Sequence, residues 1–159
     1  MAERKYAKYI ITEYPKMQGA PPADFVKRIE EQRKAGNYWD DTGLFGLNDK
    51  IAKGAFYVDC HWMWQKYGTG GIQTEIAHTH DFDEVLGFIG SNRENPRKLN
   101  SKIELWLEDE QYIIDYSCLI FVPRGMKHLP LIFHRIDSPI FFFTAGNGTS
   151  YTRSSGQES

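Results

Sequence analysis

The sequence has few of the features that mark secreted or membrane proteins. Its 159 residues include only two cysteines, Cys60 and Cys118, too few for the disulfide framework of a small secreted domain. No apolar run approaches the ~20 residues of a transmembrane helix. The charged residues 1–8 are not followed by the apolar core of a signal peptide. We therefore expect a cytoplasmic protein with two free thiols and no membrane partner.

A concentrated positive face, which a nucleic-acid partner would require, is also missing. The net charge is −2, and the one basic stretch, residues 93–102, mixes both signs. The glycine-rich residues 68–71 lack the lysine and the following helix of a phosphate-binding loop. We therefore expect no nucleic-acid partner and no phosphate site of this type.

The residues that are abundant favour a single β domain. Hydrophobic residues make up 41% of the chain and charged residues 25%, which is typical of a folded globular protein. Ten Phe, nine Tyr and four Trp suit strands and a lined pocket. The only convincing helix covers residues 23–35, where Phe25 and Ile29 share one narrow apolar face that would pack against a larger body.

From Gly54 onward, short runs of β-branched and aromatic residues alternate with turn residues, as in a sandwich or antiparallel barrel. We therefore divide the chain into an N-terminal arm and helix (1–53), an all-β barrel (54–145) and a flexible tail (146–159) that Tyr151 could anchor. Residues 6–11 could form a short strand or part of the arm. The expected strands of the barrel are 55–65, 72–80, 84–89, 101–107, 112–114, 118–122, 129–135 and 140–144.

Four residues in the barrel have the chemistry and spacing of metal ligands. If residues 72–80 form a strand, His78 and His80 point to the same face, because strand side chains alternate. Glu84 follows after a short turn and can return a carboxylate to the same place. His128 follows the turn Pro123-Arg-Gly125 as the chain enters another strand.

Three imidazoles and one carboxylate form a nitrogen and oxygen ligand set. It suits one divalent transition metal, Fe, Mn, Ni, Cu or Zn, better than Ca²⁺ or Mg²⁺. Such a set leaves one or two positions open on a six-coordinate ion, and an open position distinguishes a catalytic metal from a structural one.

These residues resemble the two motifs of the cupin superfamily. The first motif reads here as Gly71, six residues, His78-Thr-His80, three residues, Glu84, five residues and Gly90. The second reads as Pro123-Arg-Gly125, two residues and His128, with Ser117 in place of the usual leading Gly and Ile132 in place of a frequent Asn. The resemblance implies a double-stranded β-helix or jelly-roll barrel that holds the metal inside, and frequently a homodimer.

A few other residues are weaker candidates for the site. His134 lies six residues after His128 and would face the same interior if no bulge intervenes, where it could act as acid or base; a hydrogen-bonded core or rim histidine is the alternative. Trp62 and Trp64 are expected to line the barrel, although His61 and Met63 could point inward instead. Arg124 could meet an anionic substrate or be a solvated turn residue.

The function that follows is metal-dependent chemistry on a small oxygen-rich molecule bound at the open position. We lean towards a dioxygenase-like reaction, by analogy with redox cupins. A Lewis-acid isomerase, lyase or decarboxylase is the first alternative, and a non-catalytic module that binds or senses a small ligand is the second. Metal analysis would distinguish the dioxygenase-like enzyme from the Lewis-acid enzyme. Turnover of a substrate would distinguish both enzymes from the non-catalytic module.

Overall fold

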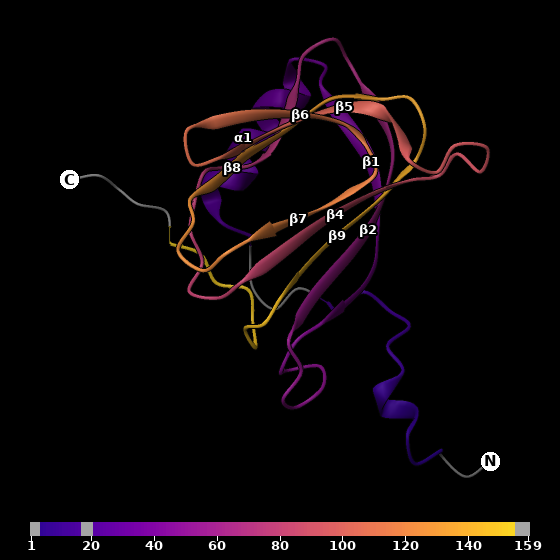
Figure 1. The fold of residues 1–159 in the computed structure, drawn as a ribbon, viewed down its shortest axis with the longest axis vertical. Coiled ribbons are helices and arrows are strands. Elements are labelled where there is room, and N and C mark those ends of the chain that lie inside the picture. Colours follow the sequence, from indigo (N-terminus) through magenta and orange to yellow (C-terminus); the bar gives the residue numbers. More distant parts are fainter. Residues whose placement is uncertain (1–3, 17–20, 155–159) are drawn as a thin grey trace.

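The computed structural model describes residues 4–16 and 21–154, which form two antiparallel sheets that face each other (Figure 1). The larger sheet has the strand order β1-β2-β9-β4-β7 and the smaller one β3-β8-β5-β6. This is the all-β jelly-roll architecture predicted from the sequence. The strands are β1 (Tyr38–Leu47), β2 (Tyr57–Tyr67), β3 (Ile72–Glu75), β4 (Glu84–Gly90), β5 (Lys98–Leu107), β6 (Glu110–Tyr116), β7 (Cys118–Val122), β8 (His128–Ile136) and β9 (Ile140–Gly146).

Strand alternation places the core between the two sheets. Leu86 and Phe88 of β4 face Ile103 and Leu105 of β5 and Phe133 of β8, and all five are almost completely buried. One end of this interior is filled by the apolar cluster. The other end contains the buried histidines, beside a cavity.

The helix α1 (Ala23–Lys34) lies where it was expected and contacts β3. Gln32 fixes it there, because its side-chain amide donates to the carbonyl of Gln73 and accepts from the Gln73 N–H. Strand β1 was not predicted: it lies before Gly54, yet it pairs with β2 and extends the larger sheet. Its sequence mixes acidic residues with glycine, and its register shifts twice, so no clean alternation is visible.

The segments outside the barrel differ in how they lie against it. Residues 6–11 contain a short 3-10 helix, η1 (Ala7–Tyr9), and no strand; in Figure 1 this part extends away from the barrel. Tyr14 and Pro15 then lie against β1, where a Cβ atom at Gly43 would come within 2.8 Å of the Tyr14 ring and one at Gly46 within 3.1 Å of Pro15. The expected flexible tail includes residues 147–154, which return to the barrel, and residues 155–159, which lie outside the described residues. Within the described ranges, no helix has the length and apolar character needed to span a bilayer.

Gly90 allows the close approach of β4 and β5. A Cβ atom there would lie 2.5 Å from the backbone carbonyl oxygen of Lys98, which cannot rotate away. We expect Gly90→Ala to lower the free energy of unfolding by about 1–3 kcal/mol, as overpacking does, measured by denaturant unfolding. The exposed neighbouring change Ser91→Ala should alter it by less than about 0.5 kcal/mol. Equal stabilities of the two variants would contradict this account.

Candidate metal centre

Three histidines from distant parts of the chain meet in the barrel interior. His78 and His80 follow β3, and His128 is the first residue of β8; His78 and His128 also pair through their backbones. Their imidazole nitrogens lie within 4.8 Å of one another. All three side chains are buried, as is Glu84, the first residue of β4. The four residues that the sequence singled out are therefore brought together.

The backbone conformation that brings the histidines together differs from the predicted single strand. Residues 72–80 are not one strand, because β3 ends at Glu75 and its register shifts between Gln73 and Glu75. His78 and His80 lie beyond this break. They still share a face because the short pairing of His78 with His128 restores extended backbone there.

Each imidazole is oriented by a backbone carbonyl. Nδ1 of His78 lies 2.7 Å from the oxygen of Ile76, Nδ1 of His80 lies 2.6 Å from that of Thr152, and Nδ1 of His128 lies 3.0 Å from that of Met126. A carbonyl oxygen can only accept, so each Nδ1 carries the hydrogen. A neutral ring then presents its lone pair on Nε2. This is the way a metal-binding histidine is usually held.

The Nε2 atoms face one another, which fits a cation between them. Nε2 of His78 and Nε2 of His80 are 3.1 Å apart, and two lone pairs at that distance repel. Nε2 of His128 is completely buried and accepts no hydrogen bond within residues 4–16 and 21–154, while Oε2 of Glu84 lies 3.0 Å from it. A buried polar atom left without a partner is costly. A metal ion, or an added proton, would satisfy these atoms.

Glu84 completes the group with a charged carboxylate. Its Oε2 lies 3.2 Å from Nε2 of His80 and 3.0 Å from Nε2 of His128, and its Oε1 accepts a hydrogen bond of 2.6 Å from the Tyr57 hydroxyl. Burial acts to raise the pKa of Glu84, but His128, His80 and Tyr57 outweigh it and lower that pKa. Burial lowers the pKa of His78 to about 4. At neutral pH, Glu84 is therefore ionised and the His78 ring is neutral, as metal ligation requires.

A cavity of about 460 Å³ leads to this group and is within the size range of small-molecule sites. His78, Glu84 and Tyr57 form one part of its wall. Most of the remaining wall is apolar, with Trp39, Met63, Leu131, Phe133 and Phe142 among its residues. The arm residue Tyr14 also borders it. An ion at the histidines would thus have room for a ligand on its cavity side.

A second polar cluster in the same cavity was not anticipated from the sequence. His61 lies between two carboxylates, with Nδ1 3.2 Å from Asp41 and Nε2 3.1 Å from Asp59. Burial acts to lower the pKa of His61, but the hydrogen bonds and charges of Asp41 and Asp59 outweigh it and raise that pKa to about 9. The cluster could not be predicted from local sequence, because Asp41 comes from β1, a strand that the sequence did not indicate, and lies two positions along from the residue that pairs with His61.

Four weaker candidates do not join the histidine group. His134 lies on the outer side of β8, where Nε2 is 2.7 Å from Glu104 Oε2; positive φ at Leu129 and a register shift against β5 break the alternation from His128. Trp62 and Trp64 stack on each other on the side of β2 opposite the cavity, which His61 and Met63 line instead. Arg124 is exposed in its turn, where its backbone N–H donates to Asp83.

Comparison with known proteins finds no family model and no curated protein that matches the sequence. Among solved structures, an oxalate oxidase in complex with glycolate matches with a TM-score of 0.45 and 10% identity over 73% of this chain and 54% of that chain. The putative ethanolamine utilization protein EutQ of Salmonella typhimurium matches with a TM-score of 0.39 and 13% identity over 69% of each chain. An oxalate decarboxylase of Bacillus subtilis matches with a TM-score of 0.41 and 16% identity over 74% and 26%.

The chain spans about half the length of the oxalate oxidase. Its own two sheets and its group of three histidines are the arrangement that the two sequence motifs imply. The fold is of the cupin type. The chemistry of this cupin-type barrel is argued below from its own residues.

The position of His61 predicts an unusual titration. We expect its pKa, measured by NMR, to be about 9 and to fall towards the ordinary ~6.5 in Asp41→Asn or Asp59→Asn. Because the folded-state pKa is the higher one, the stabilisation from protonated His61 is complete below pH ~6.5 and lost as the pH rises through 9. The stability difference between wild type and His61→Gln should therefore shrink between pH 6 and pH 10. A titration of His61 near pH 6.5 in the wild type would contradict this.

Proposed function

We propose that this chain is a metal-dependent enzyme that acts on a small oxygen-rich molecule, bound through a carboxylate, carbonyl or hydroxyl group. His78, His80, Glu84 and His128 would hold one divalent transition metal. The observation that carries the proposal is the convergence of three buried imidazoles on one point, with the ionised carboxylate of Glu84 3.0 Å from Nε2 of His128. The mostly apolar cavity that reaches His78 and Glu84 supports an open metal position.

Such an ion supplies either Lewis-acid polarisation of the bound molecule or, if redox-active, electron transfer in a dioxygenase-like reaction. The protein's own residues hold and orient the side chains that would bind the ion. The carbonyls of Ile76, Thr152 and Met126 hold the rings, and Tyr57 holds Glu84. The apolar wall limits water around the site, which strengthens electrostatic interactions there. We favour the dioxygenase-like reaction; iron in natively produced protein would support it, whereas zinc would support the Lewis-acid alternative.

The ligand set predicts which histidines matter for metal content. We expect protein expressed in metal-supplemented medium to carry about one transition-metal ion per chain by elemental analysis, and His128→Ala to lose at least tenfold in metal affinity. His134→Ala is the matched control, since His134 lies on the outer surface against Glu104, and it should keep full metal content. A wild-type protein without transition metal after supplementation, or equal losses in both variants, would refute the proposal.

We also propose that the protein is a cytoplasmic homodimer, with a second copy covering the outer face of the larger sheet. The outward positions of β9, β4 and β7, and those of β2 as far as Trp64, are apolar or glycine. Leu119 and Phe121 are 66% and 60% exposed. Four strands ~4.8 Å apart span more than 14 Å, and apolar patches above a few hundred Å² mark interaction surfaces. The outward residues that form this apolar face are Val58, Cys60, Trp62, Trp64, Val85, Gly87, Ile89, Leu119, Phe121, Phe141, Phe143 and Ala145.

An apolar face is best covered by an apolar partner, and the same face of a second copy provides one in an isologous dimer. The outer side of the smaller sheet contrasts with it, because β5 presents Lys102 and Glu104 there. The cytoplasmic location rests on the free thiols of Cys60 and Cys118.

If this face forms the dimer interface, a charged substitution in it should lower the mass of the protein in solution from dimer to monomer. We expect the wild type to be a dimer by light scattering and Leu119→Arg to be monomeric, because a buried guanidinium without a partner is strongly unfavourable. Tyr112→Arg, at an exposed position of β6, is the control and should leave the dimer intact. A monomeric wild type would refute the interface.

A further inference from the structure

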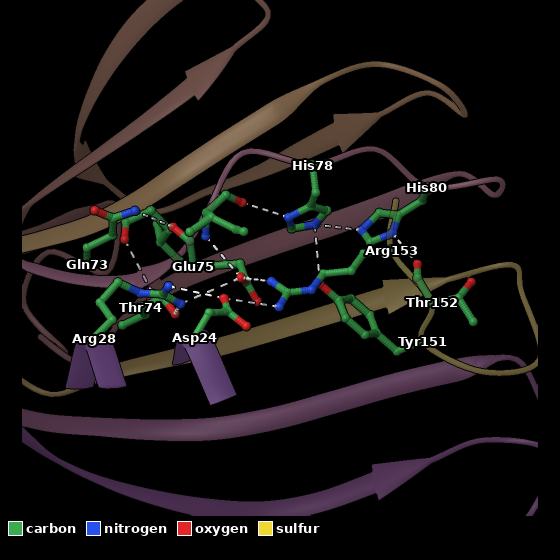
Figure 2. Close-up of polar contacts among 12 residues, drawn as sticks. Asp24, Arg28, Gln73, Thr74, Glu75, His78, His80, Tyr151, Thr152 and Arg153 are labelled. Carbon is green, nitrogen blue, oxygen red and sulfur yellow. Dashed lines mark hydrogen bonds and ion pairs between the residues drawn. The ribbon is translucent and has the colours of Figure 1, made fainter. Parts of the chain in front are cut away.

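The chain after β9 returns to the metal group and lies directly against it (Figure 2). Residues 151–154, here called the strap, pair with the segment that carries the first two histidines: the backbones of Thr79 and Ser154 exchange hydrogen bonds of 3.1 and 3.0 Å. The pairing sets Tyr151, Thr152 and Arg153 beside the site. Each of these three residues makes a different contact there.

Thr152 orients one of the three imidazoles. Its carbonyl oxygen accepts the hydrogen bond from Nδ1 of His80 at 2.6 Å. The corresponding carbonyls for His78 and His128 belong to Ile76 and Met126, two residues before each ring. His80 therefore differs from the other two, because its orientation depends on a residue 72 positions away in the chain.

Arg153 fastens the strap to the barrel and to α1. Its guanidinium forms ion pairs with Glu75 of β3 and with Asp24 of α1. Arg28 lies beside the same two carboxylates, 3.5 Å from Asp24 and 4.0 Å from Glu75. Figure 2 shows these four side chains as one group of two cations and two anions. Both guanidinium side chains are less than a fifth exposed, so their attraction is screened less than that of surface pairs.

Tyr151 contacts Nε2 of His78, the atom of that ring that would bind the metal. Its hydroxyl lies 3.2 Å from Nε2 of His78. Because Nδ1 of His78 carries the hydrogen, Nε2 can only accept, and the Tyr151 hydroxyl donates to it. The same lone pair is the one that would bind the metal, so the ion and the hydroxyl compete for it. Tyr151 also lines the cavity, and when the ion takes the lone pair, the hydroxyl is left without its acceptor at the cavity side of the site.

We propose that the strap is an integral part of the metal centre, and that the Tyr151 hydroxyl donates a hydrogen bond to a carboxylate-type ligand bound at the open metal position. The proposal deepens the proposed function and rests on it. Thr152 and Arg153 act as positioning residues: the first holds His80, and the second keeps the strap in place. The sequence predicted a flexible tail over residues 146–159 that Tyr151 could anchor, but it did not indicate a contact of this segment with the metal ligands.

The test uses full-length protein loaded with Co²⁺, whose absorption bands report both metal binding and the binding of acetate as the probe carboxylate. In Tyr151→Phe, we expect acetate affinity to fall about tenfold, the loss of one hydrogen bond to a charged group. Co²⁺ affinity should stay constant or rise a few-fold, because the competitor for the His78 lone pair is gone. Tyr116→Phe, at an exposed position of β6 with an otherwise identical change, should alter neither affinity.

Arg153→Ala tests the strap as a whole. Loosening it should weaken Co²⁺ binding as well as acetate binding, because His80 loses its carbonyl, while thermal unfolding without metal shows that the barrel is intact. A fall in Co²⁺ affinity in Tyr151→Phe, or an unchanged acetate affinity, would overturn the role of Tyr151; Co²⁺ binding by Arg153→Ala equal to that of the wild type would overturn the role of the strap. A wild type that binds no Co²⁺ refutes the proposed function and this inference with it, whereas normal Co²⁺ and acetate binding with insensitive variants refutes the inference alone.

Discussion

The structure depends on the way three imidazole lone pairs are aimed at one buried point. Backbone carbonyls accept hydrogen bonds from all three Nδ1 atoms. The lone pairs on Nε2 of His78, His80 and His128 therefore face inward. Glu84 adds further acceptor atoms to the same point. Acceptors gathered in this way repel one another unless a cation lies between them or a proton on an imidazole joins it to Glu84. The barrel, the turn before His128 and the strap all contribute to holding an arrangement that is unfavourable on its own.

The part of the site that could be predicted is the part that short stretches of sequence determine. His78, His80 and Glu84 lie within seven residues, and their common direction follows from strand alternation and one turn. His128 follows a Pro-x-Gly turn that ends close to them. These relations survive the break after Glu75, because side chains two apart in extended backbone still point the same way. The fold class was predictable for a similar reason, since eight of its nine strands are short runs with clear turn signals.

The predictions failed where a local pattern is overridden by distant contacts. The alternation that would have brought His134 inside is lost at Leu129, whose positive φ no apolar strand pattern indicates. Strand β1 was not predicted, so the contact of Asp41 with His61 across the β1–β2 pair could not be predicted either. The strap contacts the site through Thr152 and Tyr151, more than 70 residues from their partners. Composition describes such a segment as a polar tail, because only the folded barrel supplies what it pairs with.

The energetic cost of this site is itself an argument about its purpose. Burying a carboxylate and three imidazoles costs solvation free energy, and an apolar set of similar volume would pack the same space at less cost. The neighbouring positions Leu86, Leu129 and Phe133 show that this interior accepts apolar side chains. A scaffold alone gains nothing from these four polar side chains inside an apolar interior. A cation bound between them would offset the cost, and the adjoining cavity would give that ion access to a small ligand.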